Sequence, residues 1–294
     1  MHPSEHSYVE RSWLSHDGLR LYARDYAPAS GAAHCPVICI HGLTRNAADF
    51  EDLAPWLASC GRRVLAVDLR GRGRSAYDPD PSHYTPLVYA RDIAALAHSL
   101  GIARAVFIGT SLGGIVTMLL CLRHSALVAA AVLNDVGPAI SQRGLDRIAG
   151  YAGKGQPVAS WDEAADYIRR INAVAFPGNT MDDWMVWARR TFAEDAAGRL
   201  VLQYDPGIAQ PIARRKPKTS SLIAQFAFRR LARKRPTLLI RGALSDIIEA
   251  EQANRMRAAA PAMQYAEVSG VGHAPLLMEA EAREAIARFL ATAP

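Results

Sequence analysis

The 294-residue sequence has no apolar run that reaches the roughly 18 residues needed for a membrane-spanning helix. Its polar start, residues 1–10, also lacks the apolar stretch of a signal peptide. Half of the residues are apolar and 21% are charged, which is the balance of a globular chain that can bury a sizeable core. We therefore expect a cytoplasmic protein without a membrane partner.

Cysteine is scarce in this sequence, with four residues that each lie inside or beside an apolar segment. Cys35, Cys39, Cys60 and Cys121 do not follow the spacing of a metal site, so we interpret them as free thiols and expect no metal. The glycine-containing segment 68–75 lacks the third glycine of a dinucleotide-binding pattern. We therefore expect no cofactor.

Acidic residues are missing from the stretch 214–235, which carries nine lysines or arginines. This stretch accounts for much of the formal charge of +6. Such clusters are typical of a solvated helix face or a loop, and no nucleic-acid-binding motif accompanies this one. We expect no nucleic-acid partner.

Short apolar segments alternate with helical ones along most of the chain. The first two segments flank Asp17-Gly18, a strong hairpin signal. The pattern predicts strands at 8–14, 19–26, 37–40, 64–67, 105–108, 128–133, 237–240 and 264–268. It predicts helices through 53–57 and at 86–100, 112–124, 250–260 and 279–290. Alternation of this kind is typical of an α/β fold, and we expect a mostly parallel eight-stranded sheet with helices on both faces.

The alternation stops between the sixth and seventh predicted strands. From about residue 137 to 210 the sequence is typical of helices, and it includes Trp161, Trp184 and Trp187. We interpret residues 137–211 as a helical cap inserted into a core formed by residues 1–136 and 212–294. We expect the cap to cover the active site and some of its tryptophans to contact the substrate.

The segment Gly109-Thr110-Ser111-Leu112-Gly113 lies between a predicted strand and a predicted helix. A sharp strand-to-helix turn exposes a serine hydroxyl, and small residues two positions before and after it permit the close approach of the backbone. The N-terminus of the helix adds free N–H groups that suit a developing oxyanion. Ser111 is therefore the predicted nucleophile.

A serine nucleophile needs a base and a group that orients the base. His273 follows the last predicted strand in a glycine-containing loop and is the predicted base. The acid should follow a strand between serine and histidine in chain order. Asp246 and Asp135 both meet this condition, and we favour Asp246, with Asp135 as a supporting or cap-anchoring residue.

Two backbone N–H groups are candidates for an oxyanion hole. His41-Gly42-Leu43-Thr44 follows the strand at 37–40, so Leu43 can supply one donor, and Leu112 can supply the other directly after the nucleophile. Asp68 also ends a strand, but it precedes the serine, and we interpret it as structural.

With these segments in place, the chain resembles the α/β-hydrolase family over nearly its whole length. The resemblance is carried by HGLT (41–44), DLRGRGRS (68–75), GTSLGG (109–114), RGALSD (241–246) and GVGHAP (270–275). It is strongest to the capped branch that contains esterases, enol-lactonases and carbon–carbon-bond hydrolases. Haloalkane dehalogenases and epoxide hydrolases of the family have an aspartate where this chain has Ser111, which argues against both activities.

The expected activity is hydrolysis of a small-molecule ester or lactone through an acyl-enzyme on Ser111. Two alternatives remain open from the sequence. Carbon–carbon hydrolysis of a diketone would use the same residues, and a ligand receptor could use the pocket only to bind.

Overall fold

A single twisted sheet forms the centre of the molecule, and the computed structural model describes it together with the rest of residues 8–29, 34–211 and 220–294. The strands of the sheet are β1 (Val9–Leu14), β2 (Arg20–Tyr26), β3 (Val37–Ile40), β4 (Val64–Asp68), β5 (Ala105–Thr110), β6 (Val128–Asn134), β9 (Thr237–Gly242) and β10 (Gln264–Val268). Their order is β1-β2-β4-β3-β5-β6-β9-β10. The first two pairings are antiparallel and the others are parallel. The predicted eight-stranded, mostly parallel sheet is confirmed.

Helices cover both faces of this sheet, because its central strands are apolar on both sides. In β3, Ile38 and Ile40 belong to one buried core, whereas Val37 and Cys39 belong to another. The first core is completed by α2 (Pro86–Ser99), α3 (Leu112–Arg123), α8 (Leu222–Lys234) and α9 (Ala250–Ala259). The second core is completed by α1 (Leu53–Ser59) and α10 (Ala280–Thr292).

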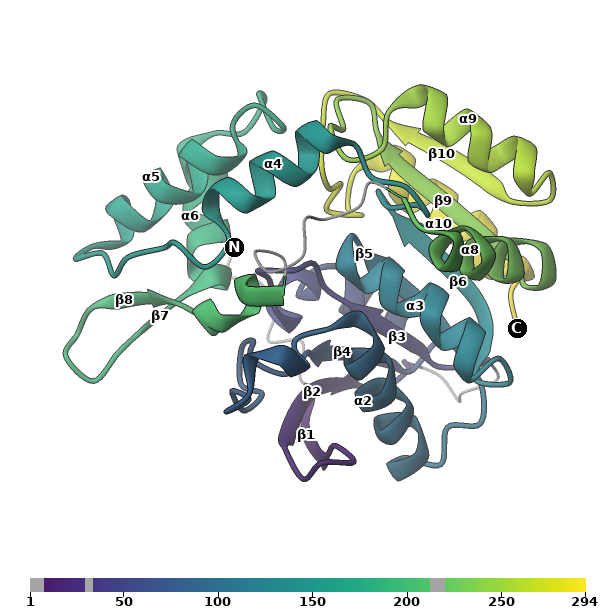
Figure 1. The fold of residues 1–294 in the computed structure, drawn as a ribbon, viewed down its shortest axis with the longest axis horizontal. Helices are drawn as coiled ribbons and strands as arrows, with labels where there is room; N and C mark the ends of the chain where they lie inside the picture. Colours follow the sequence, from purple (N-terminus) through teal and green to yellow (C-terminus); the bar gives the residue numbers. More distant parts are fainter. Residues whose placement is uncertain (1–7, 30–33, 212–219) are drawn as a thin grey trace.

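Residues between β6 and α8 leave the sheet and form a separate packing unit. It contains α4 (Gln142–Tyr151), α5 (Trp161–Asn172), α6 (Met181–Thr191), the strands β7 (Phe192–Glu194) and β8 (Leu200–Leu202), and the 3₁₀ turn η3 (Pro206–Ala209). Figure 1 shows this insert gathered on the left, away from α8, α9 and α10 on the right. It has its own apolar core, which includes Ile168, Trp184 and Trp187.

The insert differs from the prediction in one element. We expected helices up to residue 210, but β7 and β8 form an antiparallel hairpin. Its turn is held by Asp195, whose carboxylate accepts from the backbone N–H groups of Ala197 and Arg199 and from the Arg199 guanidinium. Gly198 supplies the positive φ of 74° that the turn requires. Local turn chemistry therefore overrides the helical tendency of the segment.

The basic stretch 214–235 lies partly in α8, and residues 214–219 lie outside the described residues, as does the expected boundary between 211 and 212. Within α8 and just after it, Arg230, Arg233 and Arg235 donate to backbone carbonyls of neighbouring segments. In the described part of the chain, no helix is both long and apolar enough to span a membrane. The four cysteines are free thiols.

Candidate active site

Ser111 lies at a sharp turn between β5 and α3. Its backbone has φ 53° and ψ −114°, a conformation that L-residues rarely adopt. The turn is possible because its neighbours have no side chain. A Cβ on Gly109 would lie 2.5 Å from the backbone of Gly113, and a Cβ on Gly113 would lie 2.0 Å from the carbonyl oxygen of Ile40. The predicted exposed-serine turn is therefore present, and the glycines allow α3 to begin directly against the sheet.

His273 connects Ser111 to a buried carboxylate. Its Nε2 lies 2.9 Å from Ser111 Oγ, and its Nδ1 lies 2.7 Å from Asp135 Oδ2. Because a carboxylate can only accept here, the proton belongs on Nδ1, which leaves Nε2 free to accept from the serine hydroxyl. The three side chains thus form one continuous hydrogen-bonded chain, and Asp135 itself is fully buried.

Asp135 is held in place by further donors at the carboxyl end of β9. Its Oδ1 accepts from Gly242 N–H at 2.9 Å, and its Oδ2 accepts from Ser245 Oγ at 2.5 Å. Its own N–H donates to the carbonyl of Ile240 at 2.8 Å. A buried carboxylate with donors on both oxygens can stay ionised and can stabilise a charged imidazole.

The carboxylate bonded to His273 is not the one that the sequence interpretation favoured as the acid. Asp246 forms no hydrogen bond with His273; its carboxylate receives two hydrogen bonds from Arg147 of α4, at 2.5 and 2.8 Å. Burial opposes the ionised form, but the hydrogen bond with Arg147 holds the pKa of Asp246 below its ordinary value. The partner of His273 is the rival candidate, Asp135, because it directly follows β6, whereas Asp246 lies four residues beyond the end of β9 and turns toward the insert.

Asn134, which the sequence interpretation did not single out, joins the two loops of the site. Its carbonyl accepts from Ser111 N–H at 2.9 Å, and its side-chain amide donates to the carbonyl of Pro275 at 2.8 Å. It thus connects the serine turn to the loop that carries His273. The dipeptide Asn134-Asp135 at the end of a buried strand was the available signal, because two polar residues at that position need partners.

The two predicted oxyanion donors lie next to Ser111. Leu112 is the first residue of α3, so its N–H has no acceptor within the helix. Leu43 lines the cavity, and a Cβ on its neighbour Gly42 would lie 3.8 Å from Ser111 Cβ. Among the described residues, neither N–H has a hydrogen-bond acceptor. Both donors are therefore free to receive an oxygen.

His41 and Arg72 fix the loop that carries Leu43. His41 Nδ1 lies 2.6 Å from the carbonyl oxygen of Gly42, and its Nε2 accepts from Leu69 N–H at 3.1 Å. Complete burial lowers the pKa of His41 to about 3, so its ring is neutral. Arg72 Nε donates to the carbonyl of Leu43 at 3.0 Å. Since the Gly42 carbonyl and the Leu43 N–H share one planar peptide, the bond from His41 also sets the direction of that N–H.

The cavity around Ser111 and His273 has a volume of about 110 Å³, and the insert supplies much of its wall. Trp187 lines it and makes an edge-to-face contact with Phe176, with the ring centroids 4.8 Å apart. Trp184 and Trp161 are not among the lining residues. Trp184 packs on Trp187 inside the core of the insert, and Trp161 stacks against Arg189. Spacing along a helix could not tell which tryptophan faces the cavity.

Polar side chains that sequence reasoning missed also line this cavity. Tyr151, Tyr167 and Tyr204 come from the insert, and Arg45 comes from the loop after β3. Arg45 is already neutralised, because its guanidinium donates to Asp49 at 2.5 Å and to Thr191 Oγ1 at 2.7 Å. The wall is therefore mixed rather than purely apolar.

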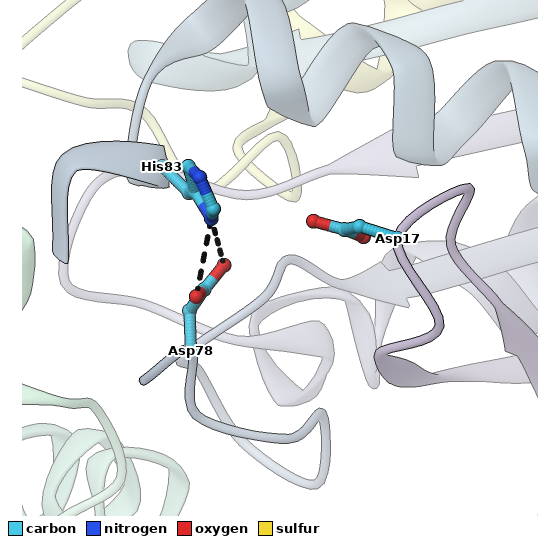
Figure 2. Close-up of side chains that lie close together, drawn as sticks. All are labelled: Asp17, Asp78 and His83. Atoms are coloured by element: carbon cyan, nitrogen blue, oxygen red, sulfur yellow. Dashed lines mark hydrogen bonds and ion pairs between the residues drawn. The ribbon is translucent and has the colours of Figure 1, made fainter. Parts of the chain in front are cut away.

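One group of side chains in the described residues has the proximity needed for a metal ion, Asp17, Asp78 and His83. Figure 2 shows Asp78 hydrogen-bonded to His83, with the Asp17 carboxylate facing the pair. Both carboxylates are already bound by the buried guanidinium of Arg70, at 2.8 and 2.6 Å. A cation would have to displace this guanidinium, so the group fits a structural ion-pair network better than a metal centre.

Asp68, which we interpreted as structural, joins the loop after β4 to the segment after β3. Its carboxylate accepts from Ala47 N–H at 2.6 Å and from Arg74 N–H at 2.8 Å. Burial raises its pKa to about 6. It does not contact Ser111 or His273, which agrees with a role in joining loops.

Comparisons with known proteins extend this picture. The model of the "Alpha/beta hydrolase family" matches residues 37–289. The chain is 32% identical over 249 residues to the 3-hydroxybutyrate-oligomer hydrolase of Cupriavidus necator, which is 83% of this chain and 84% of that protein. It is 35% identical over 125 residues to the non-heme chloroperoxidase of Streptomyces lividans, 42% of this chain and 44% of that protein.

A solved structure agrees with these sequence matches. The crystal structure of an alpha/beta hydrolase from Novosphingobium aromaticivorans superimposes with a TM-score of 0.90 at 43% identity, covering 97% of this chain and 98% of that one. The fold and the comparisons thus define a hydrolase. The chain belongs to the alpha/beta hydrolase family, and the resemblance inferred from its motifs is confirmed.

Proposed function

We propose that this protein hydrolyses carboxylic esters of small molecules, with Ser111 as nucleophile, His273 as general base and Asp135 as the carboxylate that orients the base. The observation that carries the proposal is the hydrogen-bonded chain from Ser111 Oγ through His273 to Asp135, at 2.9 and 2.7 Å. Its serine end opens on a cavity. This is the arrangement that activates a serine hydroxyl in hydrolases on several unrelated folds.

The reaction has two halves. His273 Nε2 takes the proton of Ser111 Oγ as this oxygen bonds to the ester carbonyl carbon, and the N–H groups of Leu43 and Leu112 receive the oxyanion. The bond to the leaving alcohol then breaks, and that oxygen takes the proton from His273. Water next loses a proton to His273 and attacks the acyl carbon, and the proton returns to Ser111 as the acid leaves. Asp135 stabilises the charged imidazole in both halves.

The proposed substrates are short oligoesters of hydroxy acids. The relative that matches over 84% of its length is a hydrolase of 3-hydroxybutyrate oligomers by its name. In such an oligomer the carboxyl group of one unit can form an ester with the hydroxyl group of the next. The mixed wall of the cavity, with tyrosine hydroxyls beside apolar side chains, suits an ester chain that is neither strongly polar nor purely hydrocarbon.

The insert at residues 137–211 serves, in this proposal, as the cap that limits substrate size. Its residues Tyr151, Ile171 and Trp187 line the cavity together with Ser111 and His273. A site at the carboxyl edge of an open sheet is otherwise exposed to solvent.

A serine-reactive phosphonate and a substrate panel test the proposal. The wild-type protein should be labelled at Ser111 and should cleave p-nitrophenyl acetate and a 3-hydroxybutyrate dimer, while Ser111→Ala should stay folded and lose at least 10³-fold in kcat, on the order of the loss seen when a triad serine is removed. Labelling of a different serine would contradict the nucleophile. Turnover of a vinylogous diketone without turnover of any ester or lactone would replace ester hydrolysis by carbon–carbon hydrolysis.

A further inference from the structure

A second cavity, which we name the arginine recess, adjoins the cavity at Ser111. It has a volume of about 290 Å³ and is lined by residues of α4, of α5 with the segment after it, and of the loop after β9: Arg143, Arg147, Gly150, Tyr151, Arg170, Ile171, Val174, Ala175, Leu244 and Asp246. Tyr151 and Ile171 line both cavities. The two cavities therefore adjoin each other, and these two side chains form part of the wall between them.

The charge of the recess is strongly positive. Three guanidinium groups line it, against one carboxylate, Asp246, which is bound by Arg147. In the described parts of the chain, no carboxylate forms an ion pair with Arg143 or Arg170. Two arginine side chains are thus available to an anion that enters the recess.

Helix stability alone does not favour this arrangement. Arg143 lies in the first turn of α4, where the positive end of the helix dipole disfavours a cation. Arg143 and Arg147 are four residues apart on one helix face, where like charges repel each other. Gly150 lies on the same helix, and a Cβ there would meet nothing within 4 Å, so the recess has room beside the two arginines.

We propose that the arginine recess binds the carboxylate of an anionic ester substrate while the ester carbonyl lies at Ser111, which makes oligoesters with a free carboxyl end the preferred substrates. The proposal rests on the ester hydrolysis proposed above. An oligoester of a hydroxy acid ends in a carboxylate, and guanidinium groups bind this group in a bidentate manner. Asp246 acts here as a positioning residue, because its two bonds to Arg147 hold that guanidinium at the wall of the recess.

The test compares the free acid of a 3-hydroxybutyrate dimer with its methyl ester, which is neutral and otherwise the same. Wild-type protein should cleave the free acid with the higher kcat/KM. The double variant Arg143→Gln/Arg170→Gln should raise KM for the free acid about tenfold or more, as loss of hydrogen bonds to a charged group does, and should leave the methyl ester unchanged. The matched control is Arg169→Gln, because Arg169 is the exposed neighbour of Arg170 on α5 and pairs with Asp166.

A second measurement separates binding from catalysis. The free acid should bind to the Ser111→Ala protein in calorimetry, and the two glutamine substitutions should weaken this binding by the same factor that they raise KM. Rising salt should weaken binding to the Arg143→Gln/Arg170→Gln protein less than binding to the protein that keeps both arginines.

The outcomes distinguish the two proposals. If wild type cleaves both dimers equally, or if the double variant loses activity on both to the same extent, the recess does not bind the carboxylate, although ester hydrolysis stands. If neither dimer is cleaved while p-nitrophenyl acetate is, the oligoester substrate class and the recess proposal both fail. If no ester is cleaved, the proposed function fails, and the recess proposal fails with it.

Discussion

The carboxyl edge of the sheet and the insert at residues 137–211 both line the cavity at Ser111, but they hold their functional groups in different ways. At the sheet edge, Ser111, Asp135 and Asn134 are fixed by backbone hydrogen bonds that belong to the turns after β5 and β6. In the insert, Tyr151 and Trp187 reach the cavity as side chains of α4 and α6. The proposed catalytic residues are thus positioned by main-chain hydrogen bonds. The shape of the cavity depends instead on side chains of the insert, which can be substituted without disturbing the sheet.

Asp135 and Asp246 show the same contrast within one edge. Both follow parallel strands that are neighbours in the sheet, β6 and β9. Asp135 is fully buried and bonds to His273, whereas Asp246 is partly exposed and bonds to Arg147 of the insert. The Asp135 carboxylate bonds to the proposed general base, whereas the Asp246 carboxylate bonds to the insert, which we propose selects the substrate.

The largest expected effect is the loss of kcat when one of these two carboxylates is substituted. Asp135→Asn should lower kcat by about 10³–10⁴-fold, because an amide favours the wrong tautomer of His273 and leaves its charged form without support. Asp246→Asn should change kcat on a neutral ester by less than tenfold, since it alters only the two hydrogen bonds from Arg147. Steady-state kinetics on p-nitrophenyl acetate measures both, and thermal unfolding of each variant is the control. The reverse ranking would restore Asp246 as the triad acid.

A second, smaller effect, on stability and on acyl-length preference, is expected when tryptophans of the insert are substituted. Trp187 lines the cavity, whereas Trp184 packs against it from behind, and both are almost fully buried. Changing either to alanine should cost about 3–5 kcal/mol of stability through the cavity left in the core. The Trp187→Ala protein alone should change its preference among p-nitrophenyl esters of increasing acyl length and should keep turnover of the acetate.

Trp184→Ala is the matched control for this prediction, because it removes the same side chain from the same helix and the same apolar core. Melting temperatures and the acyl-length profile of both variants are measured together. If the two profiles shift alike, loosening of the insert explains the change, and Trp187 does not form a specificity wall.

These two contrasts also mark how far the sequence could predict the structure. The ends of the eight predicted strands fall within two residues of the observed ones, because the central strands are short apolar segments and the first two flank the hairpin signal Asp17-Gly18. The serine turn was equally clear, since Gly109 and Gly113 are required by contacts with main-chain atoms nearby.

The choice between Asp135 and Asp246 could not be made from the sequence. Both residues follow a predicted strand between Ser111 and His273 in chain order. The deciding contacts, His273 with one and Arg147 with the other, join segments about 100 residues or more apart in the chain. The arginine recess was hidden for the same reason, because it is formed only when α4, α5 and the loop after β9 meet. Orientation of side chains between distant elements is a tertiary property that local patterns do not encode.

The smallest expected effect concerns His41, which fixes the Leu43 peptide from inside the sheet edge. Its pKa is lowered by burial to about 3, whereas an unfolded histidine titrates near 6.5. As the pH falls below about 6.5, the unfolded chain therefore takes up a proton that the folded protein does not, and the free energy of unfolding decreases. Between pH 6.5 and 5 this amounts to about 1.6 kcal/mol. Protonation of Nε2 would also remove the acceptor for Leu69 N–H.

The variant His41→Asn isolates this contribution, because an asparagine amide can still donate to the Gly42 carbonyl but does not titrate. Its free energy of unfolding should be lower than that of wild type at pH 7, since Leu69 N–H loses its acceptor, and should depend less on pH between 6.5 and 5. His98→Asn, at an exposed position of α2, is the control and should leave the wild-type slope unchanged. Urea unfolding at a series of pH values measures all three proteins. A His41→Asn protein with the full wild-type slope would mean that groups other than His41 cause the acid sensitivity.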